Sequence, residues 1–137
     1  MGLCAAIGFA GNQTVRAQDH KEHQEQNAGG EKIQIPDTVD GILTEIHKHH
    51  TELADTVKAK KLDEVHHHAF AIRDLAKGLP AKAKPAHKKM VENAVKKVAQ
   101  LAQALDKSGD AGDQATTEAN LKKMDAALKT LEEHATM

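Results

Sequence analysis

Residues 39–57 read VDGILTEIHKHHTELADTV, and the apolar residues in this stretch recur with helical spacing. Six positions spaced 4-3-4-3-4 fall on one side of a helix: Val39, Leu43, Ile46, His50, Leu53 and Val57. This periodicity predicts an amphipathic helix that buries one face against other helices. The fourth position of the stripe is an imidazole, His50, where an aliphatic side chain is expected. A titratable side chain in a core face is the first indication of a functional site.

Histidines are concentrated on this stretch and on the one that follows it. His47, His49 and His50 lie on the first, and residues 66–68 are consecutive histidines, so six of the ten histidines fall on two neighbouring segments. Neutral imidazole is the commonest metal-binding side chain in proteins, and its charge changes near physiological pH. The cluster therefore indicates metal binding or proton sensing.

The composition restricts the class of protein. A chain of 137 residues with 39% hydrophobic and 28% charged residues suits one small domain. Aromatic residues make up only 1% of the chain, which is rich in Ala, Leu, Lys and Glu, so an all-α fold is predicted. A net charge of -1 gives no general attraction to nucleic acid. No run of 18 apolar residues occurs, so no membrane span is predicted.

The first 35 residues differ in composition from the rest. Residues 1–17 contain an apolar stretch and then small residues before Gln18, which predicts a signal segment, although no positively charged region precedes it. Residues 18–35 lack apolar periodicity, which predicts a flexible, disordered tether. Export would give a periplasmic or secreted protein and remove Cys4, the only thiol. The alternative is an apolar N-terminus that remains on the chain.

Start and stop signals divide residues 36–137 into four predicted helices. Residues 58–61 separate the first two, Gly78-Leu79-Pro80 ends the second, and residues 108–113 separate the third from the fourth. Apolar stripes recur on the later helices: Leu62, Val65, Ala69, Ile72, Ala76 and Leu79; His87, Val91, Ala94, Val98, Leu101 and Leu105; Thr117, Leu121, Met124, Leu128, Leu131 and Ala135. Short connections favour antiparallel neighbours, so we predict an antiparallel up-down-up-down four-helix bundle.

Reflecting these helices through their turns brings the histidines of the first two helices to a similar height. The candidate metal ligands are His50, His49 and His68, with His47 and His66 as further ligands and Met124 as an auxiliary one. Glu45 and Glu64 lie one turn from His49 and His68 and are candidates for orienting their rings. The same reasoning brings His87 level with His134, where a second, weaker site is predicted.

The chemistry of these residues suits a divalent transition metal. Two imidazoles one turn apart on a helix and a third on the next helix can surround Cu, Zn, Ni or Co. No established spacing such as His-Glu-x-x-His occurs, and residues 66–68 cannot all face one point from a helix. The sequence therefore predicts a metal ion as cofactor without selecting which one.

Two segments carry a resemblance to a known class of protein: EIHKHH at residues 45–50 and EVHHHAFAIRDL at residues 64–75. They resemble the small exported, His-rich helical proteins found alongside bacterial heavy-metal efflux systems, and the resemblance covers about half the chain. It implies a periplasmic binder or sensor of divalent metal that serves metal resistance. It implies a metal-efflux or sensor protein as partner, and no catalysis.

Other functions of a four-helix bundle fit the sequence less well. A structural or adaptor bundle whose histidines pack in the core or respond to acid stays open, and it predicts helix loss near about pH 5 to 6 without metal dependence. A b-type haem-binding bundle needs Met on the first helix, which has none, and the Cys-x-x-Cys-His motif of a c-type bundle is absent. The His-x-x-Lys-Gly pattern of a histidine phosphotransfer domain is not met, since Asp74 precedes Lys77-Gly78. No nucleophile stands beside a base, so no enzymatic activity is predicted.

Overall fold

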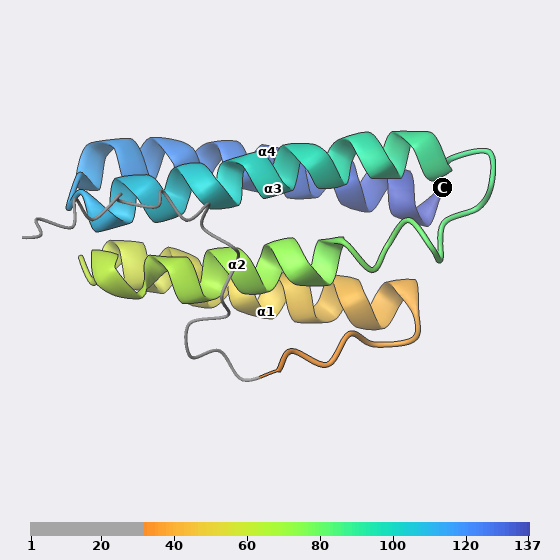
Figure 1. Ribbon diagram of the computed structural model, residues 1–137, viewed down its shortest axis with the longest axis horizontal. Coiled ribbons are helices and arrows are strands. Elements are labelled where there is room, and N and C mark those ends of the chain that lie inside the picture. Colours follow the sequence, from red (N-terminus) through yellow and green to blue (C-terminus); the bar gives the residue numbers. More distant parts are fainter. Residues whose placement is uncertain (1–31) are drawn as a thin grey trace, which may run out of the picture.

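The computed structural model describes residues 32–137, which form four α-helices and no strand (Figure 1). The helices are α1 Val39–Lys58, α2 Val65–Ala76, α3 Lys88–Asp110 and α4 Gln114–Thr136, and a 3-10 turn, η1, covers Leu62–Glu64. The predicted all-α, four-helix fold is therefore confirmed. The predictions for the signal segment and for most of the tether fall on residues 1–31, outside the described part of the chain.

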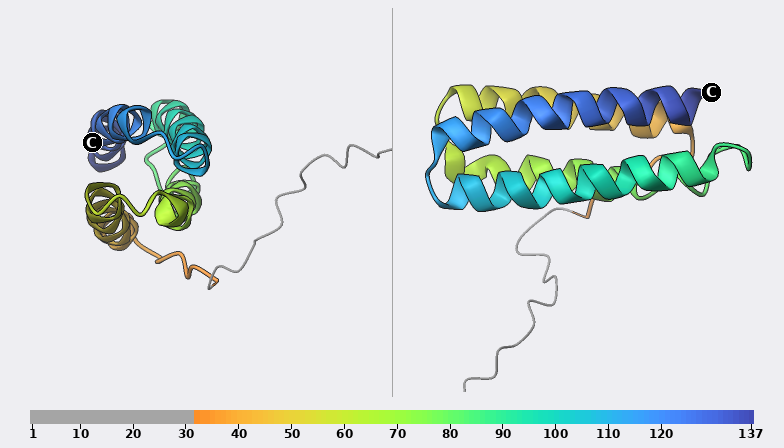
Figure 2. Two further views of the ribbon diagram at one scale, coloured as in Figure 1. Left: turned by 90° about the vertical axis from the view of Figure 1, so that its left-hand side faces the viewer. Right: turned by 90° about the horizontal axis from the view of Figure 1, so that it is seen from above.

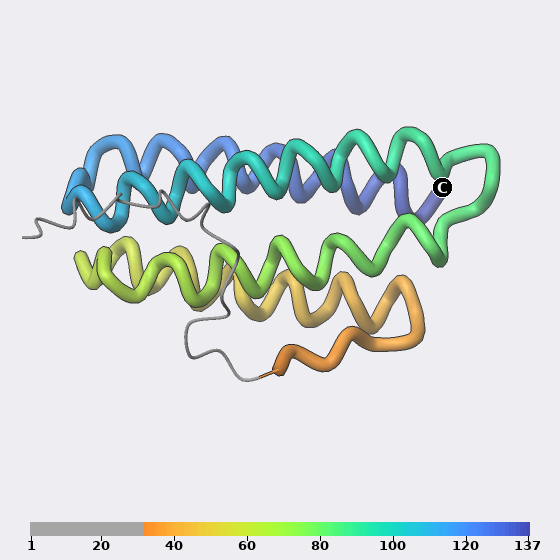
Figure 3. The backbone as a smooth tube through the Cα atoms, in the orientation of Figure 1, coloured from red at the N-terminus to blue at the C-terminus, as the bar shows by residue number. Residues whose placement is uncertain are grey.

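The four helices form a square when the bundle is viewed end on, as the left-hand view of Figure 2 shows. α1 packs against α2 and α4, and α3 packs against the same two helices. Figure 3 traces the chain along α1, back along α2, out along α3 and back along α4. Contacts between α1 and α4 agree with these directions. Gln114, at the start of α4, donates to the carbonyl of Val57 near the end of α1, whereas His47 lies opposite Glu132.

One hydrophobic core runs through the bundle. The stripe that the sequence predicts for α1 is buried at Leu43, Ile46, Leu53 and Val57. The other three helices bury most of their predicted stripes, and each contributes at least one residue that is completely buried: Ile72, Leu105 and Leu131. Val39, at the start of the stripe of α1, is only partly buried, and the His50 side chain is 18% exposed. His50 lies at the edge of the core.

The ends of the helices have identifiable physical causes. The Thr38 hydroxyl accepts a hydrogen bond of 3.1 Å from the amide of Gly41 and caps α1. The second helix begins later than its stripe predicts, since Leu62 belongs to η1 and the α-helical hydrogen bonds of α2 start at Val65. Gly109 is needed where α3 approaches η1, because a Cβ there would lie 2.7 Å from the carbonyl oxygen of Leu62.

The break between α3 and α4 is shorter than the sequence predicts. Ser108 and Gly109 were expected in the turn, but both are buried and helical, and α3 continues to Asp110. The Ser108 hydroxyl donates to the carbonyl of Leu105 and accepts from Thr117 on α4. The buried hydroxyl is therefore hydrogen-bonded within the protein. No helix in residues 32–137 is long and apolar enough to cross a membrane.

Candidate metal centre

Three potential metal ligands meet between α1 and α2: His49, Glu52 and His68. One carboxylate oxygen of Glu52 lies 3.4 Å from Nδ1 of His49 and 3.3 Å from Nδ1 of His68. The two imidazole rings are 6.0 Å apart between centroids and are tilted by 43°. One ligand atom from each residue lies within 4.8 Å of the other two, so the group could hold a metal ion.

The helical repeat explains why these three side chains meet. His49 and Glu52 are three residues apart on α1 and therefore lie on the same face of that helix. This face borders α2, from which His68 approaches. The imidazoles are 23% and 24% exposed and the carboxylate is 42% exposed, so the cluster lies at the rim of the interface, partly open to solvent.

The electrostatics of the cluster favour a neutral imidazole at His68. Burial lowers the pKa of His68 below its ordinary value of 6.5; the Glu52 carboxylate acts in the opposite direction, and His49 lowers the pKa further. His68 is therefore mostly neutral at pH 7. Nδ1 of His49 is buried and makes no hydrogen bond, although Glu52 lies nearby. Neutral imidazole is the form that binds a metal.

A pocket opens beside His49. It is lined by residues 32–37, which precede α1, and by Glu45, Lys48 and His49 of α1. Glu45 therefore shares a solvent-accessible space with His49, and Glu64 is close enough to His68 to raise the pKa of its ring. Neither glutamate belongs to the three-residue cluster, and their role in orienting the rings stays a prediction.

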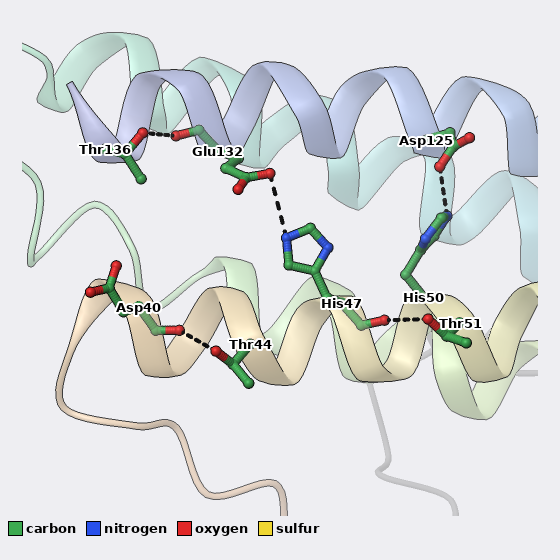
Figure 4. Close-up of polar contacts among 8 residues, drawn as sticks. All are labelled: Asp40, Thr44, His47, His50, Thr51, Asp125, Glu132 and Thr136. Carbon is green, nitrogen blue, oxygen red and sulfur yellow. Dashed lines mark hydrogen bonds and ion pairs between the residues drawn. The ribbon is translucent and has the colours of Figure 1, made fainter.

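Two of the predicted ligands face α4 instead of α2 (Figure 4). Nε2 of His50 lies 3.2 Å from a carboxylate oxygen of Asp125, and Nε2 of His47 lies 3.4 Å from one of Glu132. The structure does not bring His50 together with His49 and His68. Adjacent residues on a helix point about 100° apart, so one of these neighbouring histidines faces α2 and the other faces α4.

His66 lies on the opposite flank of α2 from His68. It belongs to a group with Asp106 and Asp110 of α3, again with one ligand atom of each within 4.8 Å of the others. The sequence assigned His66 to the same site as His49 and His68. The structure separates it from them, because residues two apart on a helix point in nearly opposite directions.

The remaining predicted residues are not part of either group in residues 32–137. His87 precedes the first residue of α3, and His134 lies in the last turn of α4. Each has a buried Nδ1 that makes no hydrogen bond, and neither imidazole belongs to a possible metal-binding group of the described residues. Met124 is completely buried in the hydrophobic core, where it packs as an apolar side chain.

Sequence reasoning missed Glu52, Asp106 and Asp110. The signal for Glu52 was its spacing of three residues from His49, the same spacing that made His47 and His50 a candidate pair. Asp106 and Asp110 are four residues apart, which also places them on one face of a helix. Their proximity to His66 depends on how α2 and α3 pack.

Comparison with known proteins found no matching family model, no matching curated protein and no matching solved structure.

Proposed function

We propose that this protein binds a divalent transition metal through His49, Glu52 and His68, in order to sequester, deliver or sense it. The observation that carries the proposal is the meeting of two imidazoles and one carboxylate at a single point between α1 and α2. Cu, Zn, Ni and Co all accept such ligands, and copper has the highest general affinity in this series.

The incomplete ligand set favours an exchangeable ion. Structural zinc sites have four protein ligands, whereas this cluster supplies three and leaves at least one coordination position for water or another ligand. The partial exposure of the cluster and the pocket beside His49 give solvent access to that position. An ion bound there could be taken up and released without unfolding of the bundle, as sequestration or delivery requires. We propose no catalytic activity.

The cellular setting of the proposal comes from the sequence. The signal-like segment of residues 1–17 favours export to the periplasm or the outside of the cell. The resemblance to His-rich proteins that accompany heavy-metal efflux systems favours a role in metal resistance, with an efflux or sensor protein as partner.

The test is a calorimetric titration of the metal-free, full-length chain with Zn, Cu, Ni and Co ions. Every sample carries Cys4→Ser, so that the thiol adds no binding. We expect one tight ion at the cluster, and we expect His49→Ala and His68→Ala each to weaken it about tenfold or more. Glu52→Gln should weaken it as well, because the amide cannot supply a negatively charged ligand.

The matched control is His67→Ala. It removes an exposed imidazole of the same helix as His68 that is not one of the three ligands, and it should leave the tight ion almost unchanged. Weak binding of several ions, indifferent to all of these substitutions, would contradict the proposal and favour the structural or acid-responsive bundle. The alternative that the bundle binds haem is tested on the same sample, by adding haem and recording the visible absorption spectrum.

A further inference from the structure

We infer a second metal site, between α2 and α3, formed by His66, Asp106 and Asp110. It takes a divalent ion that accepts oxygen ligands, and it is separate from the cluster on which the proposed function rests.

The three consecutive histidines of α2, at residues 66–68, point in different directions. His66 and His68 are two residues apart, so their side chains leave the helix about 200° from one another. His68 reaches Glu52 on α1, and His66 reaches Asp106 and Asp110 on α3. His67, between them, is exposed and belongs to neither group. One short helix thus presents an imidazole to each of its two neighbours.

The two aspartates form a one-turn pair on α3. They are four residues apart, which places both carboxylates on the face that borders α2 near His66. Asp106 is partly buried and Asp110 is exposed. The group therefore has one side held by packing and one side open to solvent, from which an ion and its remaining water ligands could enter.

The charges around Asp106 also favour a cation. Asp110 places a second negative charge one turn from Asp106, and the His66 and Arg73 side chains lie near the same carboxylate. The Arg73 guanidinium is engaged elsewhere too, since Nε donates to Asp74 at 2.8 Å and the group lies 4.4 Å from the centre of the Phe70 ring. A divalent ion between the carboxylates would relieve their mutual repulsion.

The ligand chemistry differs from that of the first cluster. One nitrogen and two carboxylate oxygens form a harder set than two nitrogens and one oxygen. Zn and Co suit both sets, while Mn²⁺ prefers carboxylate and water ligands. We therefore expect the second site to bind zinc more weakly than the first, and to be the preferred location of Mn²⁺.

The test is a Zn²⁺ titration of the full-length chain that carries Cys4→Ser. We expect two binding events. His66→Ala and Asp110→Asn should each weaken the second event about tenfold or more and leave the first unchanged. The matched control is Asp55→Asn, which removes the same charge from an exposed position on α1 outside both clusters and should leave both events intact.

A paramagnetic measurement locates the second ion directly. With the first cluster disabled by His49→Ala and Glu52→Gln, Mn²⁺ should broaden the amide NMR signals around residues 66, 106 and 110 more than those around residues 49–52. A wild-type chain with one binding event, or a second event unaffected by both His66→Ala and Asp110→Asn, would overturn the second site. Neither result would affect the proposed function, which fails if His49→Ala and His68→Ala leave the tight event unchanged.

Discussion

His49 and His50 are neighbours in the sequence with different partners in the bundle. His49 lies beside Glu52 and His68 at the border with α2, whereas His50 faces Asp125 of α4. Burial is the main reason that the pKa of His50 is lowered, with His47 acting in the same direction and the Asp125 carboxylate opposing both. The two imidazoles should therefore respond differently to substitution.

The stability of the metal-free protein should fall in mild acid, and His50 should contribute to that fall. The unfolded chain binds a proton at His50 near the ordinary pKa of 6.5, but the folded chain binds it only at lower pH. Stability is thus fully present above about pH 6.5 and is lost as the pH falls from there through the folded pKa. The lowered pKa of His68 acts in the same direction.

His50→Leu removes this contribution. Urea unfolding at pH 7 and pH 5 should show a smaller loss of unfolding free energy for His50→Leu than for the wild type. The control is His67→Leu, at an exposed position of α2, which should lose as much as the wild type. An equal loss in His50→Leu and the wild type would show that His50 does not contribute to the acid sensitivity.

Part of the site could be predicted from residues alone. Sequence reasoning grouped His49 with His68, and the structure places their ring centroids 6.0 Å apart. Sequence reasoning could not separate His50 from them. An apolar stripe determines which face of a helix is buried. Whether a residue at the edge of that face points toward α2 or toward α4 depends on the side chains that it meets there. Those partners, Glu52 and Asp125, are common surface residues without a distinctive pattern.

The ends of α1 and α3 close in the same way. In each, the amide of the third residue after the helix donates to the carbonyl five positions back, and the amide of the second residue donates to the carbonyl three positions back. The pairs are Lys61 to Thr56 and Lys60 to Val57 after α1, and Asp113 to Ser108 and Gly112 to Gly109 after α3. This is the Schellman motif, whose central residue needs positive φ. Gly112 supplies it at φ 66°, whereas Lys60 adopts φ 61° as a residue with a Cβ.

Lys60→Gly should therefore stabilise the bundle. The left-handed conformation is costly for a residue with a Cβ, and glycine removes that cost but gains freedom in the unfolded chain, so we expect a net gain of about 0.5 to 1 kcal/mol. Urea unfolding measures the gain. Lys58→Gly, inside the last turn of α1, is the control and should lose about 1 kcal/mol. A decrease of stability in Lys60→Gly would contradict this account of the turn.

These two turns also explain how well the helices could be predicted. The break at residues 58–61 was located without a glycine or proline, from the change in the apolar pattern alone. The break at residues 108–113 was placed too early, because Ser108 and Gly109 are typical turn residues. Here tertiary packing prevails, since Gly109 allows α3 to approach Leu62 and Ser108 finds partners in the interface.

At the scale of the whole bundle, ionisable groups connect α1 to α4 and α2 to both of its neighbours. His68 connects α2 to α1, His66 lies with two aspartates of α3, and His47 and His50 face carboxylates of α4. A metal ion between α1 and α2 would thus join two helices whose connection, at residues 59–64, is already short. It would add stability by binding only the folded arrangement.

Zinc should therefore raise the melting temperature of the bundle. A ligand that binds only the folded state at a free concentration of one hundred times its Kd contributes about 2.7 kcal/mol. For a folded part of this size we expect a rise of roughly 10 °C, measured by circular dichroism at 222 nm.

Addition of EDTA should reverse the rise. His49→Ala should lose most of it, since the remaining imidazole and carboxylate form an incomplete ligand set. Hydrogen exchange should show where the stabilisation acts, with protection gained first in α1 and α2. An unchanged melting temperature at high zinc concentration would mean that zinc does not prefer the folded chain to the unfolded one. That result would contradict a zinc site between α1 and α2.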